Sequence, residues 1–164
     1  MKIIHTDERS RKTVKEFLAQ HWGSSRIVVS TGTYQCERLD GFIAINDSDE
    51  MIGLITYIVL DDYMEVISFD SVYENSGTGT KLLDTLERFA VSLNLRAIQL
   101  ITTNDNLNAL GFYQKRGFQI MDVYPNSVAN ARKIKPEIPL VAENNIPIRD
   151  ELLLIKPLHE TKGK

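Results

Sequence analysis

The fold is decided by the stretch Glu74-Asn75-Ser76-Gly77-Thr78-Gly79-Thr80, read together with a second stretch further along the chain, Asn106-Leu107-Asn108-Ala109-Leu110-Gly111-Phe112-Tyr113-Gln114-Lys115-Arg116-Gly117-Phe118. The first stretch follows a strand-like run that ends at Val72, makes a glycine-containing turn and opens an amphipathic helix. Such a turn aims backbone N–H groups at phosphate oxygens. Taken alone, it is also common strand-to-helix punctuation.

The second stretch predicts a short helix that carries a tyrosine. Asp105 or Asn106 is placed to cap its start, and Tyr113 lies near its end. Gly117 stands where a helix commonly ends in the left-handed conformation. Two glycine-rich motifs of nucleotide-binding folds do not fit the first stretch. Thr80 rather than Gly precedes Lys81, which excludes a Walker loop, and Leu82 stands where a dinucleotide fingerprint needs its third glycine.

Working outward, hydrophobic periodicity predicts two helices that are separated in the sequence by several strands. Apolar residues recur at helical spacing at Val14, Phe17 and Leu18, and again from Leu82 to Leu93. Strand-like runs are separated by turn residues. The expected strands are 2–4, 26–30, 41–45, 51–60, 63–72, 97–103, 118–124 and 148–155. Antiparallel strands, then a strand-helix-strand-helix segment, then two closing strands predict an α+β fold with a single mixed, mostly antiparallel sheet flanked by helices on both faces.

Length, composition and net charge limit the number of domains and the kinds of partner. With 164 residues, 43% hydrophobic and 25% charged, the chain fits one globular domain. We assign it to residues 1–158 and expect 159–164 to be a flexible tail. A net charge of -3 gives no general attraction to nucleic acid, so no nucleic-acid partner is expected. The segment from about Pro125 to Pro147 is an unusually long connection, either a lid or an ornament.

Cysteine and histidine usage argues against a disulfide and a metal. The single Cys36 excludes an internal disulfide and is interpreted as a small apolar residue. His5, His21 and His159 lie far apart in sequence, without metal-ligand spacing. The longest apolar-rich stretch, 53–60, is too short to span a bilayer, so no membrane association is expected and a cytoplasmic location is predicted.

The two stretches together resemble the signatures of the GCN5-related N-acetyltransferase (GNAT) superfamily. Its pyrophosphate loop reads Gln/Arg-x-x-Gly-x-Gly/Ala, and here Glu74 stands in the first position, followed by Gly77 and Gly79. Its later signature reads roughly Asn-x-x-Ala-x-x-x-Tyr…Gly-Phe, which is matched by Asn106, Ala109, Tyr113, Gly117 and Phe118. The resemblance implies the acyl-CoA N-acyltransferase fold, acetyl-CoA as cosubstrate without a metal, and transfer of the acetyl group to a primary amine.

The resemblance also implies which residues hold the cosubstrate. Backbone amides at the start of the predicted helix would hold the pyrophosphate, and an amide at Ser71 or Val72 would polarise the thioester carbonyl. Asn106 would hydrogen-bond the pantetheine arm, with a helix cap as its alternative role. Thr78 and Thr80 would add hydroxyl donors, with a helix cap as the alternative role of Thr80. The expected cofactor-binding residues are Ser71, Val72, Ser76, Gly77, Thr78, Gly79, Thr80, Asn106 and Tyr113.

Three residues are candidates for acid–base catalysis. Tyr113 resembles the tyrosine that protonates the departing sulfur in many relatives, and a phenol with an ordinary pKa near 10 stays protonated at neutral pH. The alternative is an aromatic packed on the sheet. Asp70 and Glu65 are candidate bases for the amine; their odd separation places them on opposite faces of a regular strand, so at most one would face the acceptor. Each could instead be a solvated surface residue.

These residues do not identify the amine that accepts the acetyl group. Trp22, Tyr34, Phe42 and the 125–147 segment are where we expect specificity to reside, and a small-molecule amine is the first expectation because a mildly acidic protein attracts a cation. A peptide or protein amine fits the same argument. The alternative from a different class is an acyl-CoA-binding sensor or interaction module without turnover. A homodimer is possible, since closing strands in such sheets can pair between subunits.

Overall fold

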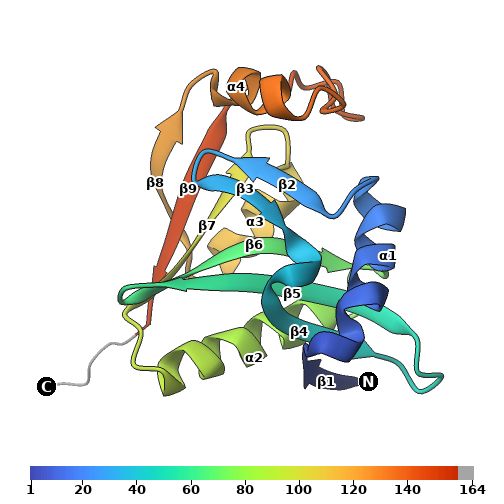
Figure 1. The fold of residues 1–164 in the computed structure, drawn as a ribbon. Coiled ribbons are helices and arrows are strands. Elements are labelled where there is room, and N and C mark those ends of the chain that lie inside the picture. Colours follow the sequence, from blue (N-terminus) through green and yellow to red (C-terminus); the bar gives the residue numbers. More distant parts are fainter. Residues whose placement is uncertain (159–164) are drawn as a thin grey trace, which may run out of the picture. The chain divides into compact units, whose positions relative to one another are not determined.

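The computed structural model describes residues 1–158; the predicted tail at 159–164, with His159, lies outside the described residues. The helices and strands along the chain are β1 (Lys2–His5), η1 (Glu8–Ser10), α1 (Arg11–Trp22), β2 (Arg26–Val29), β3 (Gly32–Gln35), η2 (Cys36–Arg38), β4 (Asp40–Ile45), β5 (Met51–Leu60), β6 (Tyr63–Ser71), α2 (Thr78–Ser92), β7 (Ala97–Thr103), α3 (Leu107–Lys115), β8 (Gln119–Tyr124), α4 (Ser127–Ile134) and β9 (Glu151–Pro157) (Figure 1). The seven-stranded sheet has the order β1-β4-β5-β6-β7-β9-β8, and β2-β3 form a two-stranded sheet.

The chain divides into two compact units, each assembled from separate stretches of sequence. The first unit contains Met1–Ile27, Tyr34–Ile98 and Leu158, and the second contains Val28–Thr33 and Gln99–Pro157. None of the helices in the described part of the chain has the length and apolarity needed to span a bilayer.

In the first unit, strands β1, β4, β5 and β6 pair antiparallel, and a helix covers each face. On one face Leu54 of β5 packs in a core cluster with Phe17 and Leu18 of α1. On the other face, a Cβ added to Gly53 would lie 2.9 Å from Leu82 Cδ1 of α2. Because consecutive strand residues point to opposite faces, α1 and α2 cover opposite sides of these strands. For this unit, the prediction of helices on both faces is confirmed.

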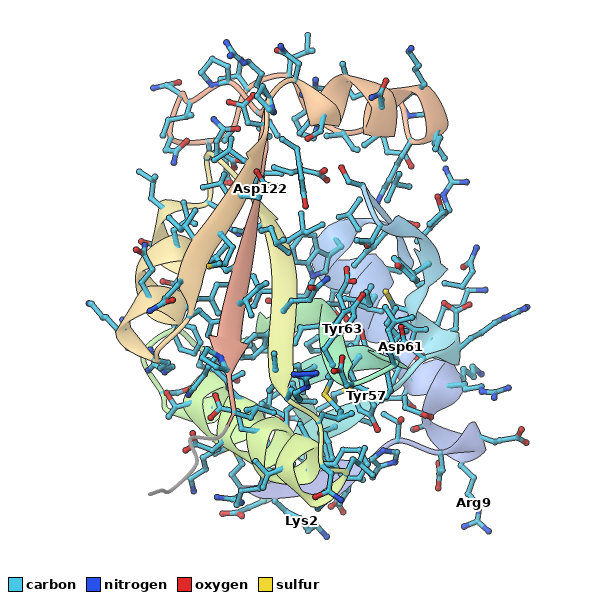
Figure 2. The ribbon with its side chains drawn as sticks, turned by 90° about the vertical axis from the view of Figure 1, so that its left-hand side faces the viewer. Lys2, Arg9, Tyr57, Asp61, Tyr63 and Asp122 are labelled. Carbon is cyan, nitrogen blue, oxygen red and sulfur yellow. The ribbon has the colours of Figure 1, made fainter. Side chains whose placement is uncertain are left out.

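The two helices of the first unit form for reasons that are local in the sequence. In α2 the predicted apolar positions Leu82, Leu83, Leu86 and Ala90 are all fully buried. Before α1, Asp7 and Ser10 form a reciprocal capping box around η1. The helix α1 ends at Gly23, whose φ of 78° is left-handed and whose N–H donates to the Ala19 carbonyl. A turn through Asp61, at φ 48°, joins β5 and β6 (Figure 2).

Close approach of strands in the first unit makes one glycine irreplaceable, and this yields a stability prediction. A Cβ at Gly41 would lie 2.3 Å from the Ile55 carbonyl oxygen and 3.1 Å from Thr56 Cα, both backbone atoms that cannot move away cheaply. We expect Gly41→Ala to lower the free energy of unfolding by about 1–3 kcal/mol, as overpacking typically does. The matched control is Gly111→Ala in α3, where the added Cβ meets nothing within 4 Å; it should be neutral or stabilising by up to about 1 kcal/mol.

Urea denaturation of the three proteins measures both effects, provided that the slope with urea stays constant so that the midpoint reports stability. Equal midpoints for Gly41→Ala and the unaltered protein would mean that β4 and β5 separate to admit the methyl group without cost.

In the second unit, β8 and β9 pair antiparallel, with Gln119 opposite Ile155 and Tyr124 opposite Glu151. The helix α3 packs on β8. It ends as the sequence predicts: Gly117 adopts a φ of 97°, and its N–H donates to the Gln114 carbonyl. The next N–H, that of Phe118, donates to the Tyr113 carbonyl at 3.1 Å. The turn therefore fixes the last residues of α3 against the following strand.

The segment between β8 and β9 is not the bare connection expected from its prolines, because it contains the helix α4. Arg132 on α4 holds the segment that follows. Its Nη2 donates to the carbonyl oxygens of Pro139 and Ile148, both at 2.6 Å, and its Nε donates to the Ile138 carbonyl at 3.2 Å. One guanidinium thus donates hydrogen bonds to three backbone carbonyl groups that lie outside the helices and strands.

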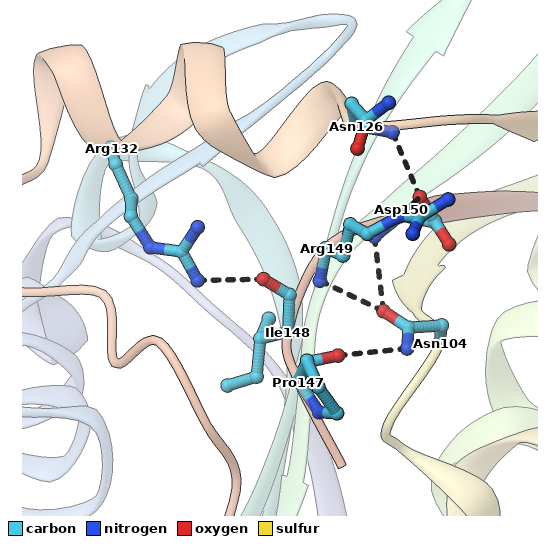
Figure 3. Close-up of polar contacts among 7 residues, drawn as sticks. All are labelled: Asn104, Asn126, Arg132, Pro147, Ile148, Arg149 and Asp150. Carbon is cyan, nitrogen blue, oxygen red and sulfur yellow. Dashed lines mark hydrogen bonds and ion pairs between the residues drawn. The ribbon is translucent and has the colours of Figure 1, made fainter.

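Asn104, at the end of β7, holds the other side of this segment (Figure 3). Its Nδ2 donates to the Pro147 carbonyl at 2.9 Å, and its Oδ1 accepts from the amides of Arg149 and Asp150, each at 3.0 Å. Asp150 in turn accepts from the Asn126 amide, and this hydrogen bond holds the pKa of the Asp150 carboxyl below its ordinary value. The segment is an ordered part of the second unit, built on side-chain to backbone hydrogen bonds.

Candidate active site

The loop between β6 and α2 has the form expected of an anion cradle. Asn75 and Gly77 both take left-handed φ values, 59° and 86°, and Gly77 stands directly before the first helical residue, Thr78. The first turn of α2 carries no acidic residue, and its Thr78 amide makes a long contact, 3.4 Å, with Ser76 Oγ. The amides of a first helical turn have no partner within the helix, and the helix dipole is positive there. The N-terminal end of α2 is therefore suited to a phosphate group.

Hydroxyl groups in this loop brace its backbone. Ser76 Oγ donates to the Tyr73 carbonyl at 2.8 Å and lies 2.9 Å from Thr78 Oγ1. Thr78 is buried, and its methyl group lies over Gly53 on β5. Gly79 and Thr80 are half-buried in the first turn. The side chains of Ser76 and Thr78 thus hold the shape of the loop, and its backbone amides are the groups that fit an anion.

The backbone amides of Ser71 and Val72 have different hydrogen-bond partners. Val72 N–H donates to the Ile52 carbonyl of β5 at 2.9 Å. Neighbouring residues of a strand direct their amides to opposite sides, so the Ser71 N–H points away from β5. It donates to its neighbour Asp70, with 2.9 Å between Ser71 N and Asp70 Oδ1. Of the two amides expected to meet a thioester carbonyl, that of Val72 is already bonded within the sheet.

A β-bulge interrupts the pairing of β6 with β5. Thr56 pairs with Ser68, whereas the next residue, Tyr57, pairs with Val66, so that Ile67 is an extra residue on β6. Thr56 and Ser68 remain on one face, where their hydroxyl oxygens are 2.5 Å apart. The bulge reverses the alternation of side chains along the rest of β6.

For this reason the expectation that Glu65 and Asp70 lie on opposite faces is wrong. Asp70 pairs with Leu54 and Glu65 pairs with Ile58. Leu54 and Ile58 are separated by an even number of residues on a regular stretch of β5, so they share a face, and cross-strand partners share it with them. Both carboxylates therefore lie on the face that α1 covers.

This face carries a strip of polar groups inside the first unit. Glu65 is only 1% exposed, which excludes its interpretation as a solvated surface residue, and Thr56 and Ser68 are also buried. Asp70, at the loop end of the strip, is 23% exposed in its side chain. Burying hydroxyl groups costs free energy unless they are paired, and the Thr56 and Ser68 hydroxyls pair with each other.

Asp70 meets two residues from the last turn of α1 that the sequence did not associate with it. Its Oδ2 lies 3.8 Å from His21 Nδ1, and the Trp22 side chain donates to it. Burial raises the pKa of the Asp70 carboxyl above its ordinary value, and His21, the Ser71 amide and Trp22 oppose that shift. A raised folded-state pKa means that Asp70 contributes most stability below its unfolded pKa, and that this contribution is lost as the pH rises through the folded value.

In the second unit, Tyr113 lies in an aromatic environment. Its ring contacts Phe112 and Phe118, with centroid separations of 5.6 and 5.5 Å, and only 8% of the residue is exposed. Burial raises the pKa of the Tyr113 phenol. The hydroxyl therefore keeps its proton well into the alkaline range, as a proton donor requires.

Asn106 occupies the position before α3, but its side chain does not cap the helix. Its Nδ2 instead donates to Thr102 Oγ1 of β7 at 3.1 Å. The helix-cap alternative for this side chain is therefore not seen. At the other end of α3, the Arg116 guanidinium lies 3.6 Å from the centroid of the Phe112 ring and donates to the Phe112 carbonyl. These contacts give Arg116 a structural role.

The three aromatic residues expected to shape specificity do not share one surface. Trp22 is 49% exposed, beside Asp70. Tyr34 packs against the core cluster under α1. Phe42 is buried on the opposite face, where its ring contacts Phe89 of α2. Within residues 1–158, no group of three or more His, Cys, Asp and Glu side chains is arranged to hold a metal ion.

Sequence comparison identifies relatives over most of the chain. Residues 8–118 match the acetyltransferase (GNAT) family. The uncharacterized protein YxbD of Bacillus subtilis strain 168 is 52% identical over 158 residues, which make up 96% of this chain and 99% of that protein. The resemblance stated from the two motifs is confirmed by this match.

Solved structures share the fold at low sequence identity. An aminoglycoside 6'-N-acetyltransferase complexed with coenzyme A superposes with a TM-score of 0.70 at 15% identity, covering 99% of this chain and 100% of that one. A GNAT family acetyltransferase from Elizabethkingia anophelis with acetyl-CoA bound gives a TM-score of 0.66 at 21% identity, covering 96% and 97% of the two chains. The predicted mixed sheet flanked by helices, the acyl-CoA N-acyltransferase fold, is confirmed.

Proposed function

Since this chain belongs to the acetyltransferase (GNAT) family, we propose that it is an N-acetyltransferase that moves an acetyl group from acetyl-CoA to the primary amine of a small molecule. The observation that carries the proposal is the start of α2. A left-handed Gly77 leads into a first helical turn that has no acidic residue. The fold neighbours crystallised with coenzyme A or acetyl-CoA support the same donor.

In this proposal the donor is held mainly by backbone. The amides of residues 76–80, with the positive end of the α2 dipole, bind the pyrophosphate. Ser76 and Thr78 keep the loop in shape through their hydroxyl contacts. Asn106 orients the pantetheine arm, and the Ser71 amide polarises the thioester carbonyl after giving up its bond to Asp70. Val72 is the weaker choice for that role because its amide is bonded to Ile52.

The transfer itself requires one bond to form and one to break. The lone pair of the neutral amine attacks the carbonyl carbon of the thioester, the C–N bond forms and the C–S bond breaks. The electron pair of the C–S bond leaves with sulfur, which takes the hydroxyl proton of Tyr113. The attacking nitrogen carries one proton too many and loses it to a base. The tyrosinate left behind regains a proton from solvent, so the protein returns to its starting state.

The acceptor side of the proposal rests on the polar strip of β6. Glu65 and Asp70 share one face, and both carboxyl groups lie in the interior of the first unit or at its margin. Carboxylates in a confined site attract a cationic amine and raise its local concentration. A small amine that carries a positive charge at neutral pH is therefore the acceptor class that we propose. A reaction that uses acetyl-CoA also suits a cytoplasmic location.

The experiment that tests the proposal combines binding with turnover. The purified protein is titrated calorimetrically with acetyl-CoA, and the same sample is assayed for thiol release with a panel of small amines and amino-terminal peptides. We expect one-to-one binding and release with small amines. Release with peptides alone would move the acceptor to a peptide amine. Binding without release would support an acyl-CoA-binding module, and absence of binding would refute the proposal.

The acyl group is tested with the same assay. Propionyl-CoA and succinyl-CoA are offered in competition with acetyl-CoA. Preferential use of a longer acyl chain would reject acetyl as the transferred group while leaving the amine chemistry in place.

A further inference from the structure

The last turn of α1 delivers a histidine to the polar strip. His21 Nδ1 lies 3.8 Å from Asp70 Oδ2, and both side chains are about a quarter exposed, at 27% and 23%. The imidazole ring is held by Phe17, whose ring centroid is 4.3 Å away. The second ring nitrogen, Nε2, has no hydrogen-bond partner among residues 1–158. His21 is thus oriented from two sides and retains one nitrogen for another molecule.

We propose that His21 is the base that removes the proton from the acceptor amine, and that Asp70 is the residue that positions its ring. This inference rests on the proposed N-acetyltransferase function and specifies its unassigned base. Sequence reasoning offered Asp70 and Glu65 for that role, because no pattern linked His21 to the strand before the glycine loop.

The geometry assigns different tasks to the two side chains. Asp70 Oδ1 already accepts from the Ser71 amide, and Asp70 Oδ2 faces His21 Nδ1. With Nδ1 facing Asp70, the neutral tautomer favoured there places the proton on Nδ1 and the lone pair on Nε2. The 3.8 Å separation is an ion-pair distance rather than a hydrogen bond. Catalytic hydrogen bonds are often long before substrate binds and shorten afterwards.

The surroundings of His21 stabilise the imidazolium that proton transfer would create. His21 lies in the last turn of α1, where the helix dipole favours a cation. The elements packed against α1 carry further charged groups: Glu8 and Arg9 on η1, and Glu37 and Arg38 on η2. Within residues 1–158, Asp70 is the only carboxylate within ion-pair distance of the ring.

The step balances without any further reactant. The lone pair on Nε2 takes a proton from the ammonium form of the acceptor, giving a neutral amine and an imidazolium. The amine then attacks the thioester carbonyl, and Tyr113 protonates the departing sulfur as described above. After the attack the nitrogen releases its second proton to solvent, and the tyrosinate regains one proton from solvent. The imidazolium releases its proton to water, so one proton in total leaves for each acetyl group transferred.

The test is the pH dependence of kcat/KM in the unaltered protein and in His21→Asn. The Asn amide can still donate toward Asp70, but it cannot accept a proton. We expect kcat/KM to fall by about 100-fold or more, and the acid limb of the pH profile to disappear. Calorimetric binding of acetyl-CoA should be unchanged, which shows that the variant is folded. Added imidazole should restore part of the turnover of His21→Ala.

Two further variants separate catalysis from packing. Asp70→Asn keeps a hydrogen-bond acceptor for Nδ1 but removes the charge, so it should lower kcat and move the acid limb to lower pH without abolishing it. His5→Asn is the matched control: His5 belongs to the opposite face, packed against Phe42 and Phe89. It should leave the pH profile in place.

The failures of the inference and of the proposed function are distinguishable. If the unaltered protein binds acetyl-CoA and releases thiol, but His21→Asn keeps its acid limb and most of its kcat/KM, His21 is not the base and the proposed function stands. If the unaltered protein releases no thiol with any amine, the proposed function fails and the inference falls with it.

Discussion

Replacing Gly77 by valine is expected to weaken acetyl-CoA binding by at least about 100-fold. Gly77 has a φ of 86°, a conformation that a β-branched residue adopts only under strain. Valine would force this turn toward negative φ and redirect the amides of the first α2 turn. A hydrogen bond to a charged group contributes about 1.5–3 kcal/mol, so losing two of them corresponds to a loss of affinity of this size. Calorimetric titration with acetyl-CoA measures it directly.

The matched control for Gly77→Val is Gly77→Asn. Asparagine tolerates positive φ, and a Cβ at this position meets no protein atom within 4 Å. If the left-handed turn is what matters, the asparagine variant should bind within a few-fold of the unaltered protein. If the cosubstrate must approach bare backbone at this position, asparagine will abolish binding as valine does. Unchanged affinity in Gly77→Val would remove this loop from the donor site.

Replacing Tyr113 by phenylalanine is expected to lower kcat by about 100-fold or more with little change in acetyl-CoA affinity. The ring would keep its contacts with Phe112 and Phe118, so only the hydroxyl is lost. Since burial raises the pKa of this phenol, the proton is present throughout the range in which thiol release is assayed. An alkaline limb in the pH profile below about pH 10, the ordinary value for tyrosine, would therefore have to come from another group.

Tyr63→Phe is the matched control for this substitution. Tyr63 begins β6, at the end of the strand away from the glycine loop (Figure 2). The same loss of a hydroxyl there should leave kcat unchanged. Full turnover in Tyr113→Phe would take Tyr113 out of the mechanism and leave it as an aromatic residue of α3. A parallel loss of acetyl-CoA affinity and kcat would instead give the hydroxyl a binding role.

Much of the fold is determined by local sequence. Leucine spacing predicted α2, and Leu82, Leu83, Leu86 and Ala90 are buried as expected, whereas Leu93 lies past the end of the helix and is 44% exposed. Gly117 was predicted to end its helix in the left-handed conformation, and it does so; Gly77, identified by motif before its helix, also adopts a positive φ, which an L-residue with a Cβ disfavours. Tyr113 and Asn106 were identified by motif, and the structure places them on and directly before α3. These features depend on neighbours within a few residues, which is why the sequence alone predicts them.

Other features depended on contacts between distant residues. The helix α4 was missed because it is short, with only Val128 and Ala131 buried, and because the segment that follows it is held by Arg132 and Asn104 through bonds to the backbone. The side-chain role of Asn106 could not be separated from a helix cap, because its partner Thr102 is on the preceding strand.

The face of β6 that α1 covers shows most clearly which features the sequence determined and which only the tertiary structure decided. The sequence by itself determined the family, the acyl-CoA N-acyltransferase fold and the residues from which a site could be built. Only the tertiary structure decided that Glu65 and Asp70 share a face, because the extra residue at Ile67 exists only relative to the partner strand β5. It likewise decided that His21 meets Asp70, since helical spacing gives the face of α1 that is buried, but packing selects the strand residue it contacts.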